Sequence, residues 1–327
     1  MKQNAADIPV HTFQRKAAIS TGSVQDYAGR VTVSGIPDFD LNKTIFNTLE
    51  GRIPRFVMQT RIAKEVAWAD DEQSVIDEAY SEVSGAIELP TINPDLLTFM
   101  VEECDFDVEH ADGSFLDHLY FCYEYTHHHL PGHSALVMLL HSILGTGTNT
   151  FAMGPEKIPA LKALVDDDEW LHIESFPSVL RLLYDGKLRA ELWQNTERLD
   201  QLQSVHFYRV IDNQPITMSA EQFWVQLNYQ LIHLVDFLPV SNWKTHANDT
   251  SFIIFRDLYD FLERTGHLKA KVDYIKSSNT QFIGEEQSIW AKLVSMIPVS
   301  LSERMAGKSI RQFSGHIDHS LDFEIQW

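Results

Sequence analysis

Cysteine is almost absent from this chain, because its 327 residues include only Cys104 and Cys122. Both lie in segments whose apolar pattern predicts burial, and two thiols give no disulfide framework for a chain of this length. We therefore expect both cysteines to be reduced, as is usual in a cytoplasmic protein. Residues 1–7 lack the apolar core of a secretory signal peptide, which agrees with that location.

Positive charge and long apolar runs are also scarce. The chain has 26 basic against 46 acidic residues, which gives a formal net charge of −20. A negative field of this size repels nucleic acids and anionic membrane surfaces, so we expect neither as a partner. No apolar run reaches the roughly 18 residues that a transmembrane helix needs. A small-molecule substrate is compatible with this charge, because a bound metal ion can reverse the local field.

Several catalytic signatures are missing as well. The chain has no Gly-x-Ser-x-Gly nucleophile elbow and no dinucleotide fingerprint. Its Thr146-Gly-Thr-Asn149 segment lacks the Gly-Lys-Ser/Thr ending of a phosphate loop. His110-Ala-Asp112 matches part of a 2-oxoglutarate-type iron site, but such a site requires a β-barrel, and strand signals are few. These absences disfavour nucleophilic catalysis, a phosphate loop and a barrel-type iron enzyme.

The dominant pattern is a helical spacing of apolar residues, which predicts a mainly α protein. Residues 1–50 are polar and predict an N-terminal arm, in which Val31–Ser34 is either a short strand or irregular. We divide the rest into a helical lead-in over 51–104, a core over 105–240 and a C-terminal helical extension over 241–327. Helices are expected near residues 45–84, 94–103, 115–126, 135–144, 155–200, 220–238, 250–265, 284–296 and 300–307.

Two of these predicted helices rest on different kinds of signal. In the lead-in, Ile62, Val66 and Trp68 continue a helical spacing of apolar residues. At the start of the helix predicted over 220–238, Ser219 and Gln222 form a capping box. The first prediction depends on periodicity alone, whereas the second has a defined start.

The histidine-rich segment in the middle of the chain predicts a turn between two helices. Pro131-Gly132 breaks the chain after the three histidines 127–129, which we expect in a solvated loop. Ser134 is placed to cap the helix that follows. The tail histidines His316 and His319 are expected at the surface.

Two further histidines occupy the apolar faces of consecutive predicted helices. His118 lies one helical turn from Phe115 and Cys122, and His141 lies one turn from Val137. A buried imidazole needs a partner, and a metal ion is a partner that two neutral imidazoles can share. The pattern therefore indicates a candidate metal site.

A third helix adds a carboxylate to this set. Asp236 lies one helical turn from His233 and follows an apolar run. A carboxylate buried there without a partner would be unfavourable. Each of these residues can also be explained without a metal. A lone histidine on an apolar face is more often a hydrogen-bonded core residue than a ligand. Asp117 also fits a helix cap, and Asp236 can pair with Lys244 or Arg209.

Motifs within residues 105–240 resemble the HD superfamily, a helical fold of metal-dependent phosphohydrolases with some oxygenase members. That family places one histidine early on a helix, a Leu-Leu-His-Asp-Ile-Gly motif on the next helix, and a final aspartate on a later one. Here His118, Leu139-Leu-His141-Ser-Ile143 and Asp236 match these positions. The resemblance covers about two fifths of the chain and implies a helical bundle with N- and C-terminal extensions.

One branch of the family, poorly characterised, is more similar still. Its helix with Asp-His-Leu is followed by Phe-His-Ser-Ile-Tyr-Gly-Thr, and this chain has Phe115-Leu-Asp-His-Leu119 and then Leu140-His-Ser-Ile-Leu-Gly-Thr146. Ser142 stands where most HD proteins have the aspartate that completes a two-metal centre. The resemblance therefore favours a mononuclear site over two-metal phosphoester hydrolysis.

The resemblance implies one divalent transition metal, Fe, Mn or Zn. Its ligands would be His118, His141 and Asp236, with His233 or His110 as a fourth. The implied function is a metal-dependent enzyme acting on a small molecule, a hydrolase by family default or an oxygenase if the metal is iron.

Three other residues are candidates for acid–base catalysis or substrate contact, namely Asp117, His110 and His133. Two alternatives stay open. In one, the chain is a non-catalytic HD-like binding or regulatory module that has lost its metal. In the other, Ser142 only caps a local hydrogen bond while other groups do the chemistry.

Overall fold

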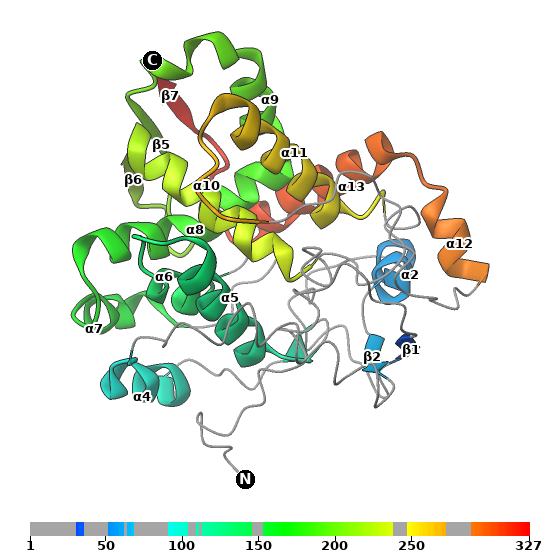
Figure 1. Cartoon of the computed structure of the whole chain (residues 1–327), viewed down its shortest axis with the longest axis horizontal. Coiled ribbons are helices and arrows are strands. Elements are labelled where there is room, and N and C mark those ends of the chain that lie inside the picture. Colours follow the sequence, from blue (N-terminus) through cyan, green and yellow to red (C-terminus); the bar gives the residue numbers. More distant parts are fainter. Residues whose placement is uncertain are drawn as a thin grey trace.

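The computed structural model describes residues 31–35, 52–61, 64–68, 91–103, 109–110, 113–145, 153–237, 247–272 and 289–327 (Figure 1). The protein is mainly helical, which confirms the predicted class. The helices are α2 (Arg52–Arg61), α4 (Pro94–Glu103), α5 (Phe115–His129), α6 (Leu136–Leu140), α7 (Ile158–Lys162), α8 (Asp167–Asp185), α9 (Lys187–Gln194), α10 (Ala220–Val235), α11 (Thr250–Thr265), α12 (Ile289–Ser295) and α13 (Val299–His316), with two short 3-10 helices at Pro155–Lys157 and Thr196–Gln201.

The described strands form three small antiparallel sheets. Strand β1 (Val31–Gly35) pairs with β2 (Lys64–Trp68), and β3 (Glu109–His110) pairs with β4 (Gly113–Ser114). Strands β5 (Ser204–Tyr208), β6 (Pro215–Ser219) and β7 (Glu324–Gln326) form a three-stranded sheet in the order β6-β5-β7. This sheet pairs residues 324–326 of the C-terminal extension with residues 204–206 of the predicted core.

The helical prediction for Ile62, Val66 and Trp68 is wrong in its second half. Residues 64–68 form strand β2, in which Val66 lies opposite Val33 of β1. The physical reason is the backbone pairing with a distant segment, since residues 64–68 form an antiparallel ladder with residues 31–35. A short segment with apolar residues at alternate positions fits either structure until its partner is known.

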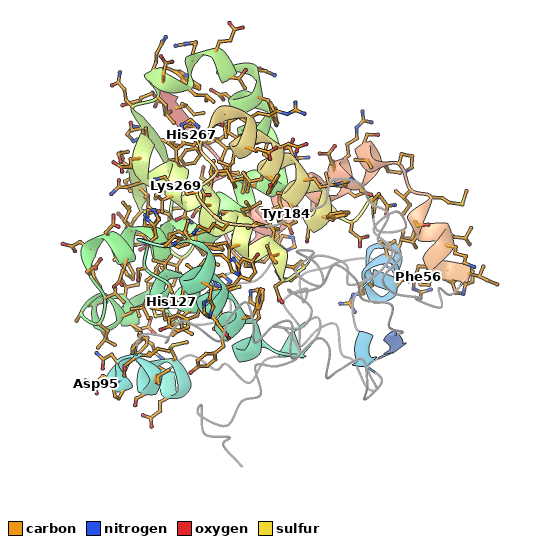
Figure 2. All side chains as sticks on the ribbon, in the orientation of Figure 1. Phe56, Asp95, His127, Tyr184, His267 and Lys269 are labelled. Atoms are coloured by element: carbon orange, nitrogen blue, oxygen red, sulfur yellow. The ribbon has the colours of Figure 1, made fainter. Side chains whose placement is uncertain are left out.

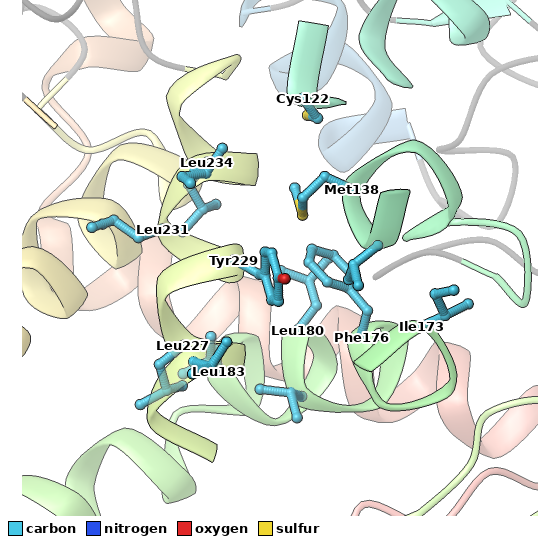
Figure 3. Close-up of a cluster of buried hydrophobic side chains, with 14 of the residues drawn as sticks. Cys122, Met138, Ile173, Phe176, Leu180, Leu183, Leu227, Tyr229, Leu231 and Leu234 are labelled. Carbon is cyan, nitrogen blue, oxygen red and sulfur yellow. The ribbon is translucent and has the colours of Figure 1, made fainter. Parts of the chain in front are cut away.

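Five helices enclose the main core. Helices α5, α6, α8, α10 and α11 pack against one another, and their apolar faces meet in a continuous cluster (Figure 3). Figure 3 shows Phe176 and Leu180 of α8 facing Met138 of α6 and Tyr229 of α10. Burial of these faces supplies most of the driving force that holds the helices together.

Helices α8 and α10 begin at well-formed capping boxes. At α8, the side chain of Asp166 accepts a hydrogen bond from the Glu169 backbone N–H, and the side chain of Glu169 accepts one from the Asp166 backbone N–H. At α10, Ser219 and Gln222 form the box that the sequence predicted. Pro177 lies inside α8. Because proline has no backbone N–H, it cannot donate the helical hydrogen bond to the carbonyl oxygen one turn earlier. These caps fix where the two central helices start.

The connection between α5 and α6 corrects a predicted boundary. Helix α5 continues to His129, so histidines 127–129 form its last turn and are half-buried instead of lying in a solvated loop. Figure 2 labels His127 on this helix. The chain then turns at Pro131-Gly132, where the positive φ of +84° at Gly132 suits glycine. Ser134 Oγ accepts from the backbone N–H of Leu136, but the predicted Ser134 cap is wrong, because the N-cap residue of α6 is Ala135 and no side chain caps the helix.

The C-terminal segment also departs from expectation. Helix α13 continues to His316 and is longer than predicted. His319 is buried, with only 5% of its surface exposed, whereas we expected it at the surface. The reason is tertiary, because β7 adds to β5 and carries the preceding residues against the domain. None of the described helices is both long and apolar enough to cross a lipid bilayer.

Candidate metal centre

Three histidines from three helices meet in the core. His118 lies in the first turns of α5, His141 follows the last residue of α6, and His233 lies in the last turn of α10. One ring nitrogen from each lies within 4.8 Å of the other two, and their exposed fractions are 1%, 0% and 6%. Among the described residues, this triad is the one such group of metal-ligating side chains.

Asp236 sets the orientation of the His118 ring. It directly follows α10, and its Oδ2 lies 2.7 Å from His118 Nδ1, with both side chains buried. A carboxylate oxygen accepts hydrogen bonds, so His118 Nδ1 carries the proton and donates. In a neutral ring, His118 Nε2 is then a bare acceptor.

A backbone carbonyl group orients the His141 ring, as Asp236 orients the ring of His118. Its Nδ1 lies 2.6 Å from the carbonyl oxygen of Met138, one turn earlier, and donates a hydrogen bond to it. The Nε2 atoms of His141 and His118 then face each other at 3.1 Å. With both Nδ1 atoms protonated, two lone pairs face each other at this distance, and a positive species between or beside them satisfies both. That species is either a proton, which makes one ring cationic, or a metal ion.

Burial disfavours protonation of the His141 ring. Desolvation, with a smaller contribution from His118, lowers the pKa of His141 well below its ordinary value, although the hydrogen bond to Met138 acts in the opposite direction. A buried neutral imidazole is the form that binds metals. The geometry also fits, because metal–nitrogen bonds of about 2.0–2.1 Å hold two nitrogens of one ion roughly 3 Å apart.

Cys122 lies beside the triad without belonging to it. Its Sγ is 3.9 Å from both ring nitrogens of His118. Burial, followed by the charge of Asp236, raises the pKa of the Cys122 thiol well above its usual value. The thiol is therefore protonated at neutral pH and packs against the ring as a small apolar group.

Two phenylalanines form walls of the site. The Phe176 ring lies 4.7 Å from the ring of His141 and 5.3 Å from that of His233, measured between centroids. The Phe237 ring lies 5.3 Å from His118 and 5.1 Å from His233. These apolar walls lower the local dielectric constant and strengthen any charge interaction inside the site.

The structure brings together four of the residues singled out in the sequence, namely His118, His141, His233 and Asp236. Their role as metal ligands stays a prediction. Asp236 contacts the ring nitrogen of His118 that faces away from His141, which is the position of a residue that orients a ligand.

Of the three predicted acid–base candidates, His133 is the one whose side chain the structure describes. His133 is half-buried in the turn before α6, and none of the contacts described for it involves the triad. Burial lowers its pKa, Lys269 lowers it further, and Asp168 and Glu221 oppose these effects. His110 lies on β3 and Asp117 on α5, but their side chains lie outside the described structure. Cys104 also lies outside the described residues.

One feature of α10 was missed in the sequence. Gln222, Gln226, Gln230 and His233 recur at spacings of four, four and three residues, so they share one face of a largely apolar helix. Gln226 and Gln230 are fully buried. This polar stripe was readable from the spacing alone, and it leads along the helix to the triad.

Comparisons of the chain with protein-family models, with curated proteins and with solved structures find no match. The function of the site therefore has to be inferred from its own geometry.

Proposed function

We propose that the triad holds one divalent transition metal, and that the protein is a mononuclear metal-dependent enzyme that hydrolyses a small molecule. The observation that carries the proposal is the 3.1 Å approach of His118 Nε2 and His141 Nε2, while both Nδ1 atoms are committed to oxygen acceptors. His233 completes the ligand set from α10. The resemblance to the HD superfamily supports the same helices as the source of the ligands.

The number of ligands favours catalysis over a purely structural role. Structural zinc sites are closed by four protein ligands, whereas catalytic sites use three and leave a position open. A metal bound to three histidines would act as a Lewis acid and lower the pKa of a coordinated water molecule. Fe, Mn and Zn all accept imidazole ligands, so the donor set does not select among them.

The chain's own residues have distinct roles in this proposal. Asp236 and the Met138 carbonyl fix the two rings in the tautomer that exposes Nε2. Phe176 and Phe237 keep the surroundings apolar. Ser142 is buried at the position where the two-metal HD proteins carry an aspartate, so we propose a single ion.

Burial supports a second candidate function. The exposed fraction of the triad is 6% or less for each residue, which also suits a metal that holds α5, α6 and α10 together in a non-catalytic module. Removal of the metal separates the two functions. A catalytic site leaves the fold intact when emptied, whereas a structural site loses helical content and unfolds cooperatively at lower temperature.

The first experiment is elemental analysis of protein purified without a histidine tag or chelator. We expect close to one equivalent of Fe, Mn or Zn per chain, and loss of that metal in His118→Ala and His141→Ala. His172→Gln is the matched control, because His172 is equally buried but outside the triad. Full occupancy in both alanine variants would show that the ligands are wrongly assigned. Absence of metal, even after reconstitution, would leave the cationic-ring interpretation.

A further inference from the structure

Helices α8 and α10 run side by side in the same direction, joined by one hydrogen bond per turn. Gln222 Nε2 donates to Asp168 Oδ1 (3.4 Å), His172 Nδ1 donates to Gln226 Oε1 (2.8 Å), and Gln230 Nε2 donates to a carbonyl oxygen of α8 (2.9 Å). In each pair the two residues are 54 positions apart. The constant offset shows that the polar stripe of α10 faces α8 along its length.

Two buried amide atoms in this seam have no partner among the described residues. They are Nε2 of Gln226 and Oε1 of Gln230, and both side chains are 0% exposed. A buried polar group that forms no hydrogen bond is strongly unfavourable, and native proteins usually satisfy it with an ordered water molecule.

The two atoms are complementary, and their residues are one helical turn apart on α10. Gln226 offers an N–H donor and Gln230 offers a carbonyl acceptor, one helical turn further along the same face. Side chains at this spacing lie about 5–6 Å apart at Cβ, which is close to the span of two hydrogen bonds through one water oxygen.

The seam runs from the surface towards the triad. At its outer end lie half-buried Gln222 and exposed Asp168. At its inner end, Gln230 donates to the carbonyl oxygen of Phe176, and the ring of Phe176 contacts His141 and His233.

We propose that the seam between α8 and α10 is an internal water site, in which water bound between Gln226 and Gln230 supplies the triad from the surface. The water site is inferred from the two buried amide atoms, Gln226 Nε2 and Gln230 Oε1. The supply role rests on the proposed metal centre, and the two parts are tested separately.

The first test is a crystal structure of the metal-free wild-type protein, at a resolution that shows ordered waters. The expected result is a water oxygen within hydrogen-bond distance of both Gln226 Nε2 and Gln230 Oε1. A seam closed by protein atoms alone, with those two atoms paired to other side chains, would overturn the water site. This test needs no metal, so it stands even if the proposed function fails.

The second test measures water exchange at Mn(II) bound to the triad, by relaxation of ¹⁷O-labelled water. Gln230→Met keeps the volume of the side chain and removes its hydrogen bonds. Leu231→Met is the control, because Leu231 is equally buried on the same helix but outside the stripe. We expect exchange about tenfold slower in Gln230→Met, since one lost hydrogen bond changes a rate by about that factor, and no change in Leu231→Met. Equal exchange in Gln230→Met and wild type would overturn the supply role.

Discussion

His319 and His141 are both buried histidines, but their surroundings satisfy them in different ways. Nδ1 of His319 accepts a hydrogen bond from Arg181 Nη1 (3.4 Å), and its Nε2 donates to the carbonyl oxygen of Tyr208 (3.0 Å). One nitrogen therefore acts as acceptor and the other as donor, which is what a neutral imidazole offers. His319 needs nothing beyond the protein.

His141 has a complementary partner on one side only. Its Nδ1 donates to backbone, but its Nε2 faces another acceptor, Nε2 of His118. The comparison teaches that burial alone does not mark a functional histidine. The informative feature is a pair of acceptors that face each other, because an additional positive species satisfies both.

The largest expected effect is stabilisation by zinc. At a free zinc concentration about 1,000 times the dissociation constant, a ligand that binds only the folded state stabilises it by about 4 kcal/mol. We expect this increase in the free energy of unfolding for the chelator-treated wild-type protein, measured by urea denaturation. His319→Gln should respond like the wild type, whereas His141→Ala should not respond. An equal response in His141→Ala would place the zinc at some other site.

The second prediction concerns pH and the satisfied histidine. Burial, the largest cause, lowers the pKa of His319; the Tyr208 carbonyl opposes it and the charge of Arg181 adds to it, so that the pKa is about 4. Between pH 6.5 and about 4 the unfolded chain therefore binds a proton at residue 319 that the folded chain does not. The contribution of this pKa difference to the free energy of unfolding is fully present above pH 6.5, and it is lost as the pH falls towards 4.

The variant His319→Gln isolates this contribution. Glutamine can still accept from Arg181 and donate to Tyr208, but it does not titrate. We expect the wild type to lose on the order of 2–3 kcal/mol more stability than the variant between pH 7 and pH 4. Urea denaturation at a series of pH values measures the difference. Parallel pH profiles for the two proteins would contradict the assignment.

The sequence predicted those parts of the fold whose signals are local. The capping box at Ser219 and the apolar spacing after it located α10, and the spacing over 250–265 located α11. The proximity of His118, His141 and Asp236 was also predicted, from apolar faces and a family resemblance together.

The parts that the sequence did not predict depend on contacts between distant segments. Strand β5 pairs with β7, which lies more than a hundred residues later, and this pairing helps to bury His319. Strand β2 required its partner β1 to be recognised. The position of Asp236 on Nδ1 of His118, instead of on the shared side of the triad, depends on side-chain rotamers that a helical pattern does not encode.

The smallest expected effect distinguishes the two possible roles of Asp236. If it orients His118, then Asp236→Asn weakens metal binding by about 10–100-fold, or about 1.4–2.7 kcal/mol, because the ring loses its preferred tautomer while all three histidines remain. Competition with a chromophoric chelator measures this affinity. Asp257→Asn is the control, since Asp257 pairs with Arg189 at a separate position. A loss far beyond 100-fold would instead make Asp236 a direct ligand, as the sequence suggested, and an unchanged affinity would remove it from the site altogether.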